Sequence, residues 1–297
     1  MSEIRDLTWF GSLNLTISID PELLLASSNV PQGSSAKLTS VSIRVPRESY
    51  LVLYLPYIVG RFEPQLRNNV VDYYNGWWFE MEGVPISWNY PIGALFDSLT
   101  GLNPAIRSTQ FCDNSLNVWN LTLRHGTHLP SSVIPLRAGS EQIREMWMHQ
   151  WKQACFVMNG SSKLIMSFSK SDTLAFWDAI VRRDLGKFNL IRQRIVPEAS
   201  SMKSLPLRLH LSLPDIRLVE PVCNTYDNGK ETLLSDVLGQ EFPEWFNISS
   251  VSASLAKAVA QGIDIPVEAP VLALYLQLAS FDGFLHVSLC LEGQRES

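Results

Sequence analysis

The spacing of hydrophobic residues divides the chain into alternating, strand-like segments near both ends and a helical middle. In the first third, alternation predicts strands at Asn14–Asp20 and Val41–Val45, since every second side chain of a half-buried strand faces the core. The rest of this unit is predicted as a helix from Pro46 to Arg61, a hairpin of Trp77–Met81 and Pro85–Trp88 turning at Glu82-Gly83, a helix at Pro91–Leu99 and a strand at Val118–Arg124.

The last third repeats this order. Its predicted elements are strands at Leu205–Leu213 and Arg217–Cys223, a helix at Thr232–Gly239, strands at Ala253–Ala260 and Ile263–Ile265, a helix at Val271–Leu278 and a strand at Phe284–Leu291. The order is typical of the ubiquitin-like, or β-grasp, fold, in which the first and last strands pair at the sheet centre through a right-handed crossover.

The middle of the chain has a helical period. We expect a helix from Ser140, as N-cap, to Asn159-Gly160 as its C-terminal stop. Lys152 lies opposite its apolar stripe, with Met148 and Phe156 one turn away on either side. The buried stripe is expected to contain Ile143, Met146, Trp147, Trp151, Ala154 and Met158. We therefore expect Lys152 to be an exposed amine with apolar neighbours, although most lysines on helices only keep the surface soluble.

A second helical stripe follows from Asp172. Its expected members are Leu174, Trp177, Val181, Leu185, Phe188 and Ile195. Ser/Pro-rich stretches at Gly126–Gly139 and Val196–Leu205 indicate boundaries. The predicted architecture is therefore α+β: ubiquitin-like domains at 1–126 and 201–297 flank a helix-rich domain at 127–200.

Composition narrows the classes of function. A net charge of −5 over 297 residues gives no general attraction to nucleic acid. The N-terminal residues lack the pattern of a secretory signal, no apolar run could span a bilayer, and the four separated cysteines resemble reduced thiols. We expect a cytoplasmic protein without a disulfide, structural zinc or cofactor.

No catalytic constellation is evident. His125 and His128 have zinc-like spacing but no third ligand in sequence, so two loop histidines are the simpler interpretation. Cys155 could act as a nucleophile with His149 or His286 as its base, but its place near the buried stripe favours an apolar filler. The alternative of a cysteine-dependent transferase stays open.

Several long runs resemble the autophagy protein 5 family. They are Val45–Leu51, Trp78–Leu99, His149–Lys163 and Phe281–Leu289, so the resemblance extends over nearly the whole chain. It implies that Lys152 accepts the C-terminal glycine of the ubiquitin-like autophagy protein 12 in an isopeptide bond. It also implies that a helix of the coiled-coil autophagy protein 16 binds in a groove between domains.

The resemblance further implies an E3-like scaffold without catalytic residues of its own. Its complex would recruit an E2-like enzyme that joins autophagy protein 8 to phosphatidylethanolamine on the isolation membrane. Met148 and Phe156 are the candidates for modifier docking, and Trp88, Tyr90 and Phe96 those for the partner groove, although aromatic residues serve cores more often. Candidates for peripheral membrane contact are Lys163, Lys170, Arg182 and Arg183. A tandem ubiquitin-like module without a covalent partner is the blander alternative.

Overall fold

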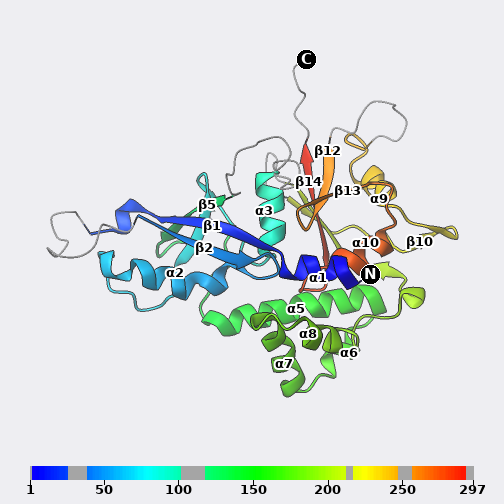
Figure 1. The fold of residues 1–297 in the computed structure, drawn as a ribbon, viewed down its shortest axis with the longest axis horizontal. Helices are drawn as coiled ribbons and strands as arrows, with labels where there is room; N and C mark the ends of the chain where they lie inside the picture. Colours follow the sequence, from blue (N-terminus) through cyan, green and yellow to red (C-terminus); the bar gives the residue numbers. More distant parts are fainter. Residues whose placement is uncertain (1, 26–38, 102–117, 212–216, 247–255, 292–297) are drawn as a thin grey trace, which may run out of the picture.

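The computed structural model describes residues 2–25, 39–101, 118–211, 217–246 and 256–291. Two twisted sheets stand beside each other, and the long helix α5 (Gly139–Asn159) runs along one side of both (Figure 1). Helices α6 (Lys163–Met166), α7 (Lys170–Val181) and α8 (Leu185–Arg192) lie on the other side of α5. The long helix is therefore covered from more than one direction.

The first sheet has the strand order β2-β1-β5-β3-β4. Its strands are β1 (Ser12–Ile19), β2 (Ser40–Pro46), β3 (Trp77–Met81), β4 (Val84–Pro85) and β5 (Val118–His125). The first and last strands, β1 and β5, pair in parallel, and β1 pairs with β2 antiparallel. Glu82 and Gly83, both with positive φ, form the predicted hairpin turn.

Helices α2 (Leu55–Phe62) and α3 (Ile92–Thr100) complete this unit, with a 3-10 turn at Leu51–Tyr54 before α2. The predicted helical start at Pro46 is wrong. The chain bends at Arg47, whose N–H donates to the carbonyl of Gly11 and whose carbonyl accepts from the N–H of Gly93. These two bonds hold the residue after β2 between the start of β1 and α3.

The second sheet has the equivalent order β13-β12-β14-β7-β8. Its strands are β7 (Leu207–Leu211), β8 (Arg217–Val219), β12 (Ala256–Ala260), β13 (Ile263–Ile265) and β14 (Leu285–Leu291). The parallel pair β7–β14 matches β1–β5 in the first sheet. Helices α9 (Leu234–Glu241) and α10 (Val271–Leu278) pack with this sheet. Two ubiquitin-like domains flanking a helix-rich domain are thus confirmed.

The predicted strand at 205–213 is interrupted. Pro206 has no N–H for a ladder, and the chain divides there into β6 (Ser204–Leu205) and β7. Strand β6 pairs with β9 (Cys223–Asn224), apart from the main sheet. A small hairpin of β10 (Tyr226–Asp227) and β11 (Lys230–Glu231) follows.

Two details of the helical prediction are corrected. The N-cap of α5 is Ala138, and the Gln142 side chain accepts from the N–H groups of Arg137 and Ala138. The stripe expected after Asp172 is correct only in part, because a turn with φ +60° at Arg183 separates α7 from α8 and breaks the period. Of its expected members, Phe188 and Ile195 are buried, and Trp177 and Leu185 are partly buried against the core. The buried residues are Phe176, Ala179, Ile180, Phe188, Ile191 and Ile195, whereas Leu174 and Val181 are exposed.

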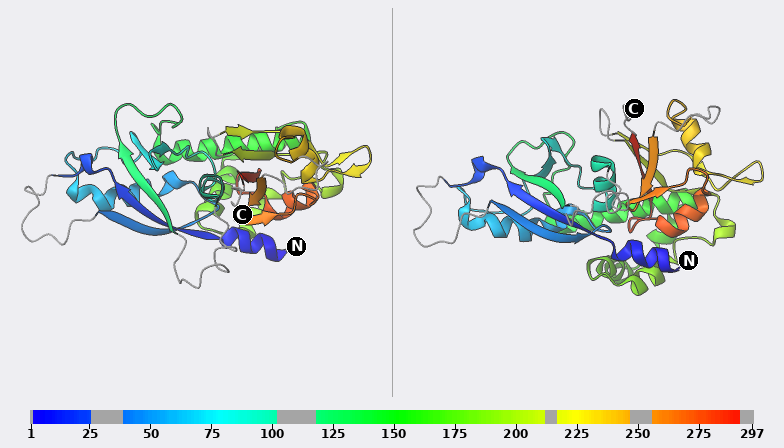
Figure 2. Two further views of the ribbon diagram at one scale, coloured as in Figure 1. Left: turned by 90° about the horizontal axis from the view of Figure 1, so that it is seen from above. Right: turned by 45° about the horizontal axis from the view of Figure 1, so that its top comes forward.

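Helix α1 (Ser2–Phe10), which packs against α10, was not predicted (Figure 2). Its buried Trp9 lies 4.7 Å from the ring of Phe188, between ring centroids, and the guanidinium of Arg183 covers it. Most of the predicted loop Ala26–Ser40, Cys112 and the end of the chain lie outside the described residues.

Gly283 is the glycine whose replacement we expect to damage the domain packing most. Its φ is +91°, and a Cβ there would lie 2.9 Å from the Cβ of Ala154 and 3.0 Å from the Trp151 ring. Gly283→Ala should lower the free energy of unfolding, measured in urea, by about 3 kcal/mol through backbone strain and overpacking.

Gly229→Ala is the matched control, since Gly229 has φ +77° but no atom within 4 Å of an added Cβ. It should lose only about 1 kcal/mol, the cost of the left-handed backbone. Equal losses in the two variants would contradict the close approach of Gly283 to α5.

Candidate functional site

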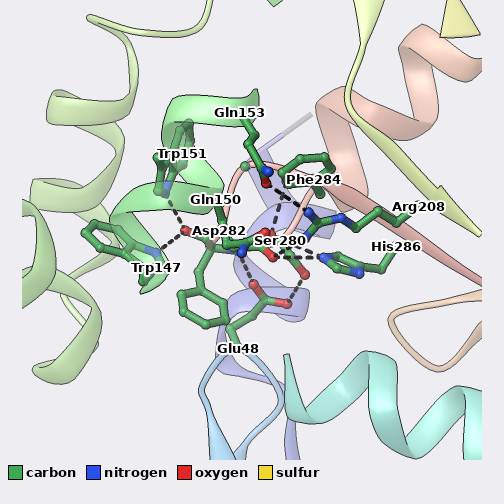
Figure 3. Close-up of polar contacts among 12 residues, drawn as sticks. Glu48, Trp147, Gln150, Trp151, Gln153, Arg208, Ser280, Asp282, Phe284 and His286 are labelled. Carbon is green, nitrogen blue, oxygen red and sulfur yellow. Dashed lines mark hydrogen bonds and ion pairs between the residues drawn. The ribbon is translucent and has the colours of Figure 1, made fainter. Parts of the chain in front are cut away.

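The loop of residues 280–283, between α10 and β14, is the point where the three domains meet. The indole N–H groups of Trp147 and Trp151 both donate to the backbone carbonyl of Phe281, at 2.9 and 2.8 Å. Both indoles come from α5 and are fully buried (Figure 3). This carbonyl thus fixes α5 against the second ubiquitin-like domain.

Glu48, from the first ubiquitin-like domain, binds the same loop. Its carboxylate accepts from the N–H of Phe281, the hydroxyl of Ser280 and the amide of Gln261. Figure 3 shows Glu48 beside Ser280. Burial raises the pKa of Glu48 above its ordinary value, although these hydrogen bonds oppose the rise. The backbone carbonyl of Glu48 also accepts from Arg183 at 3.0 Å, which brings in the helical bundle.

An ion pair inside the first ubiquitin-like domain also contacts the second domain. Arg47 contacts the buried carboxylate of Asp97 at 2.5 Å, and the same oxygen of Asp97 accepts from the N–H of Gly262 at 2.8 Å. Burial raises the pKa of Asp97, while Arg47 and the N–H of Gly262 lower it, and the net direction is upward. The contact between the domains is therefore polar as well as apolar.

Beyond this junction lies a buried pair of histidines. His210 and His286 share a hydrogen bond of 2.8 Å, and His286 also contacts Asp282 at 3.0 Å. Burial, then the neighbouring His286 and Arg208, lower the pKa of His210 well below its ordinary value, so His210 is neutral at pH 7. Tyr90 packs edge-on against both imidazoles. Both histidines belong to the second ubiquitin-like domain, so their packing with Tyr90 is a contact between the two ubiquitin-like domains.

Arg208 extends the network toward the surface of α5. Its guanidinium binds Glu220 at 2.7 Å and the side-chain oxygen of Gln153 at 3.3 Å. It also lies 3.6 Å from the ring centroid of Phe284 and 3.7 Å from Asp282 (Figure 3). The side chain of Arg208 is only 4% exposed, so these contacts hold it firmly.

Lys152 lines a groove of about 710 Å³ between α5 and the second ubiquitin-like domain. The walls include Phe156 and Val157 from α5, Leu205 from β6, and Val222 before β9. Lys152 is half-buried, so the prediction of an exposed amine is corrected, since the residue lies inside a groove that β6 and β9 also line. Among the described residues, Lys152 has no hydrogen-bond or ion-pair partner.

The apolar neighbours of Lys152 differ from each other. Phe156 is 59% exposed, as predicted for a docking candidate. Met148 is only 9% exposed and packs in the hydrophobic core that the first ubiquitin-like domain shares with the helical bundle, so its predicted exposure is wrong. The reason is that α5 is covered from several directions and buries more than one stripe.

The aromatic candidates for a partner groove are also corrected. Trp88 and Phe96 are buried in the same core as Met148. The indole N–H of Trp88 donates to the carbonyl of Ile134, and Phe96 packs on Trp119. Only Tyr90 retains partial exposure. The high aromatic content of this segment therefore mainly serves the core.

The basic candidates for membrane contact separate into two groups. Lys163, Lys170 and Arg182 are exposed, and Arg182 pairs with Asp178 one turn before it. Arg183 is corrected, since it is half-buried and its guanidinium is engaged by Glu48 and the Trp9 ring. In the part of the chain that the structure describes, no helix has the length and apolar character to cross a bilayer.

The alternative chemistry finds little support. Cys155 is fully buried, and its thiol contacts the carbonyl of Ser161 at 3.4 Å, with no histidine among its partners in the described residues. His125 packs on Trp77, and the described residues contain no group of three side chains suited to a metal ion. Cys155, Cys223 and Cys290 are free thiols.

Sequence reasoning missed the residues of the junction. Glu48 and Asp282 look like surface carboxylates in the sequence. The partners of Glu48 are more than 130 residues away, and Asp282 contacts Arg208 of another strand, so no local pattern indicates their burial. The available signal was Gly283, which follows Phe281-Asp282 and needs a positive φ.

Comparisons with known proteins agree along the chain. Three models of one family match: "Autophagy protein ATG5, UblA domain" at residues 8–125, its "alpha-helical bundle region" at 140–198 and its "UblB domain" at 204–289. Autophagy protein 5 of Eremothecium gossypii is 40% identical over 98% of this chain and 96% of its own. That of Saccharomyces cerevisiae is 35% identical over 97% and 96%.

A solved structure is also similar. The "Crystal structure of Kluyveromyces marxianus Atg5" superposes with a TM-score of 0.79 at 31% identity, covering 97% of this chain and 99% of that chain. The arrangement of two sheets around the helical bundle is therefore shared with that protein.

Glu48 offers a test of the junction. Glu48→Ala leaves two buried donors, the N–H of Phe281 and the hydroxyl of Ser280, without their acceptor, so we expect the free energy of unfolding to fall by about 2–4 kcal/mol. Glu145→Gln, at an exposed position on α5, should change it by less than about 0.5 kcal/mol. Urea unfolding of both variants measures the difference, and a small loss in Glu48→Ala would contradict the role of this carboxylate.

The same site has a pH signature. The folded-state pKa of Glu48 lies above its unfolded value, so its contribution to stability is complete below the unfolded pKa and is lost as the pH rises through the folded pKa. Glu48→Gln does not titrate there. Its free energy of unfolding should rise relative to the native chain as the pH increases above the ordinary glutamate pKa of about 4.3, and a constant difference would contradict the assignment.

Proposed function

The chain belongs to the autophagy protein 5 family, and we propose that it is an E3-like scaffold of autophagy that accepts the ubiquitin-like autophagy protein 12 at Lys152. The observation that carries this proposal is the amine of Lys152, which lies in a partly apolar groove and has no ion-pair partner among the residues that the structure describes. An acceptor amine must be reachable and free of a competing ion pair, while the thioester chemistry belongs to other enzymes. Lys152 meets both conditions.

The partners proposed for the complex follow from family membership. Autophagy protein 16 would contribute a helix that binds between domains, where Tyr90 is the remaining candidate of our aromatic set. The conjugate would recruit the E2-like enzyme that attaches autophagy protein 8 to phosphatidylethanolamine. Phe156, the exposed apolar neighbour of Lys152, would contact the modifier.

We expect Lys152→Arg to abolish the covalent product. Arginine keeps the positive charge and the length but cannot form the isopeptide bond, so the fold should be unchanged. The measurement is a denaturing gel after incubation with autophagy protein 12, its E1-like and E2-like enzymes and ATP.

Lys163→Arg is the matched control, because Lys163 is an exposed lysine just beyond α5. It should form the conjugate normally. A product of the same size in Lys152→Arg would refute the proposed acceptor. Loss of product in Cys155→Ser with the fold intact would instead favour the cysteine-dependent alternative, and no product from the native chain would favour a non-covalent module.

We further propose peripheral contact with the isolation membrane by a protein that resides in the cytoplasm. Lys163, Lys170 and Arg182 are exposed on the helical bundle, and Leu164 and Met166 expose apolar surface beside the first of them. Basic residues near an anionic surface each contribute about 1 kcal/mol, and salt weakens this attraction.

Replacing these three basic residues together with glutamine should therefore reduce co-flotation with anionic vesicles by at least about tenfold at low salt. Neutral vesicles provide the baseline for both proteins. A triple variant that floats like the native chain on anionic vesicles would place the contact elsewhere.

A further inference from the structure

Two oppositely charged side chains line the acceptor groove without pairing with each other. Lys152 projects from α5, and Glu220 lies on the opposite wall, between β8 and β9. No oxygen of Glu220 lies within 4.0 Å of the Lys152 amine, so these two described residues do not form an ion pair. Because the groove is partly apolar, attraction between these charges should be stronger than in open water.

Arg208 explains why Glu220 stays away. Its Nε binds one carboxylate oxygen of Glu220 at 2.7 Å, and Glu220 itself is 51% exposed, so it could otherwise move. Arg208 cannot follow such a movement easily. Its guanidinium is fixed by Gln153, Asp282 and the ring of Phe284.

We propose that Arg208 is a positioning residue for the acceptor site: it holds Glu220 against the second ubiquitin-like domain and thereby leaves the amine of Lys152 unpaired. The importance of Arg208 for conjugation rests on the function proposed above. The effect of Arg208 on the Lys152 amine does not depend on that function.

The chemistry of transfer shows why this matters. A neutral amine attacks the thioester carbonyl of the modifier, a C–N bond forms, the C–S bond breaks and the E2 cysteine leaves as a thiolate. The proton lost by the amine balances the charge of that thiolate. An ion pair with Glu220 would stabilise the ammonium form, which has no lone pair, and would also have to be broken before attack.

The other titratable groups lining the groove beside Lys152 cannot replace Glu220 in this role. They are His149 on α5 and Cys223 on β9. Burial raises the pKa of Cys223 to about 12, so its thiol is neutral at pH 7. Glu220 is thus the carboxylate whose position decides the charge environment among the described lining residues.

Acetylation of Lys152 by an N-hydroxysuccinimide ester tests the proposal without any conjugation enzyme. The rate is measured by peptide mass spectrometry from pH 6.5 to 10, with Lys163 in the same sample as the internal reference. In Arg208→Gln the released Glu220 should pair with Lys152. We expect acetylation at pH 7.5 to slow by about three- to tenfold and the half-maximal rate to move to higher pH.

The double variant Arg208→Gln with Glu220→Gln should restore the native profile, because the carboxylate that captures the amine is gone. Glu220→Gln alone should match the native chain. A merely structural role of Arg208 would not be rescued by changing Glu220. If Arg208→Gln does not fold, Arg208→Met, which fills the space beside Phe284, serves in its place with the same expected shift and rescue.

An unchanged profile in the Arg208 variant, or a double variant that stays slow, would overturn the proposal. The same proteins are then tested for conjugation, where rates should follow the acetylation rates. If acetylation shifts and is rescued as expected but even the native chain forms no conjugate, the acceptor function fails while the role of Arg208 stands.

Discussion

The carbonyl oxygen of Phe281 accepts two indole N–H groups from one helix, and the arrangement of the three domains depends on this shared acceptor. Neither indole has access to water, so each would remain unsatisfied if the loop moved away. The N–H of the same residue donates to Glu48 from the opposite domain. One peptide loop therefore satisfies buried polar groups from both of its neighbours, and a shift of any domain would break several hydrogen bonds at once.

This constraint determines what α5 can present. With its tryptophans directed into the junction, the helix turns Lys152 and Phe156 toward the groove beside β6 and β9. Arg208 joins the two regions, since it contacts Asp282 in the loop and Glu220 in the groove. Arg208 thus connects the rigid junction to the carboxylate of Glu220, which lines the same groove as Lys152. A scaffold that only presents an amine to other enzymes benefits from such rigidity, because it fixes the direction of approach.

Much of the fold could be predicted because it is local. Short-range rules predict the alternating strand at Asn14–Asp20, the turn at Glu82-Gly83 and the helix at Val271–Leu278. The repeated order of elements indicates two related sheets. The site was predicted only in part. Lys152 lies on the correct helix, but a helical wheel assumes one buried face, and α5 has more than one.

Long-range contacts explain the remaining errors. Some residue types typical of docking or membrane surfaces are buried or bound by distant parts of the chain, as at Met148, Trp88 and Arg183. The same holds for the carboxylate of Glu48, whose hydrogen-bond partners lie more than 200 residues away. Such pairings depend on how the domains meet, which no periodicity within a single element records.

Hydrogen exchange of the indole N–H groups of Trp147 and Trp151, followed by NMR in the native state, tests the central claim most directly. If the Phe281 carbonyl holds the domains together, both indole protons should exchange only through global unfolding, at the rate of the slowest amides in β5 and β14. Exchange of either indole orders of magnitude faster than those amides would show that the domains separate while each remains folded, and would contradict the account.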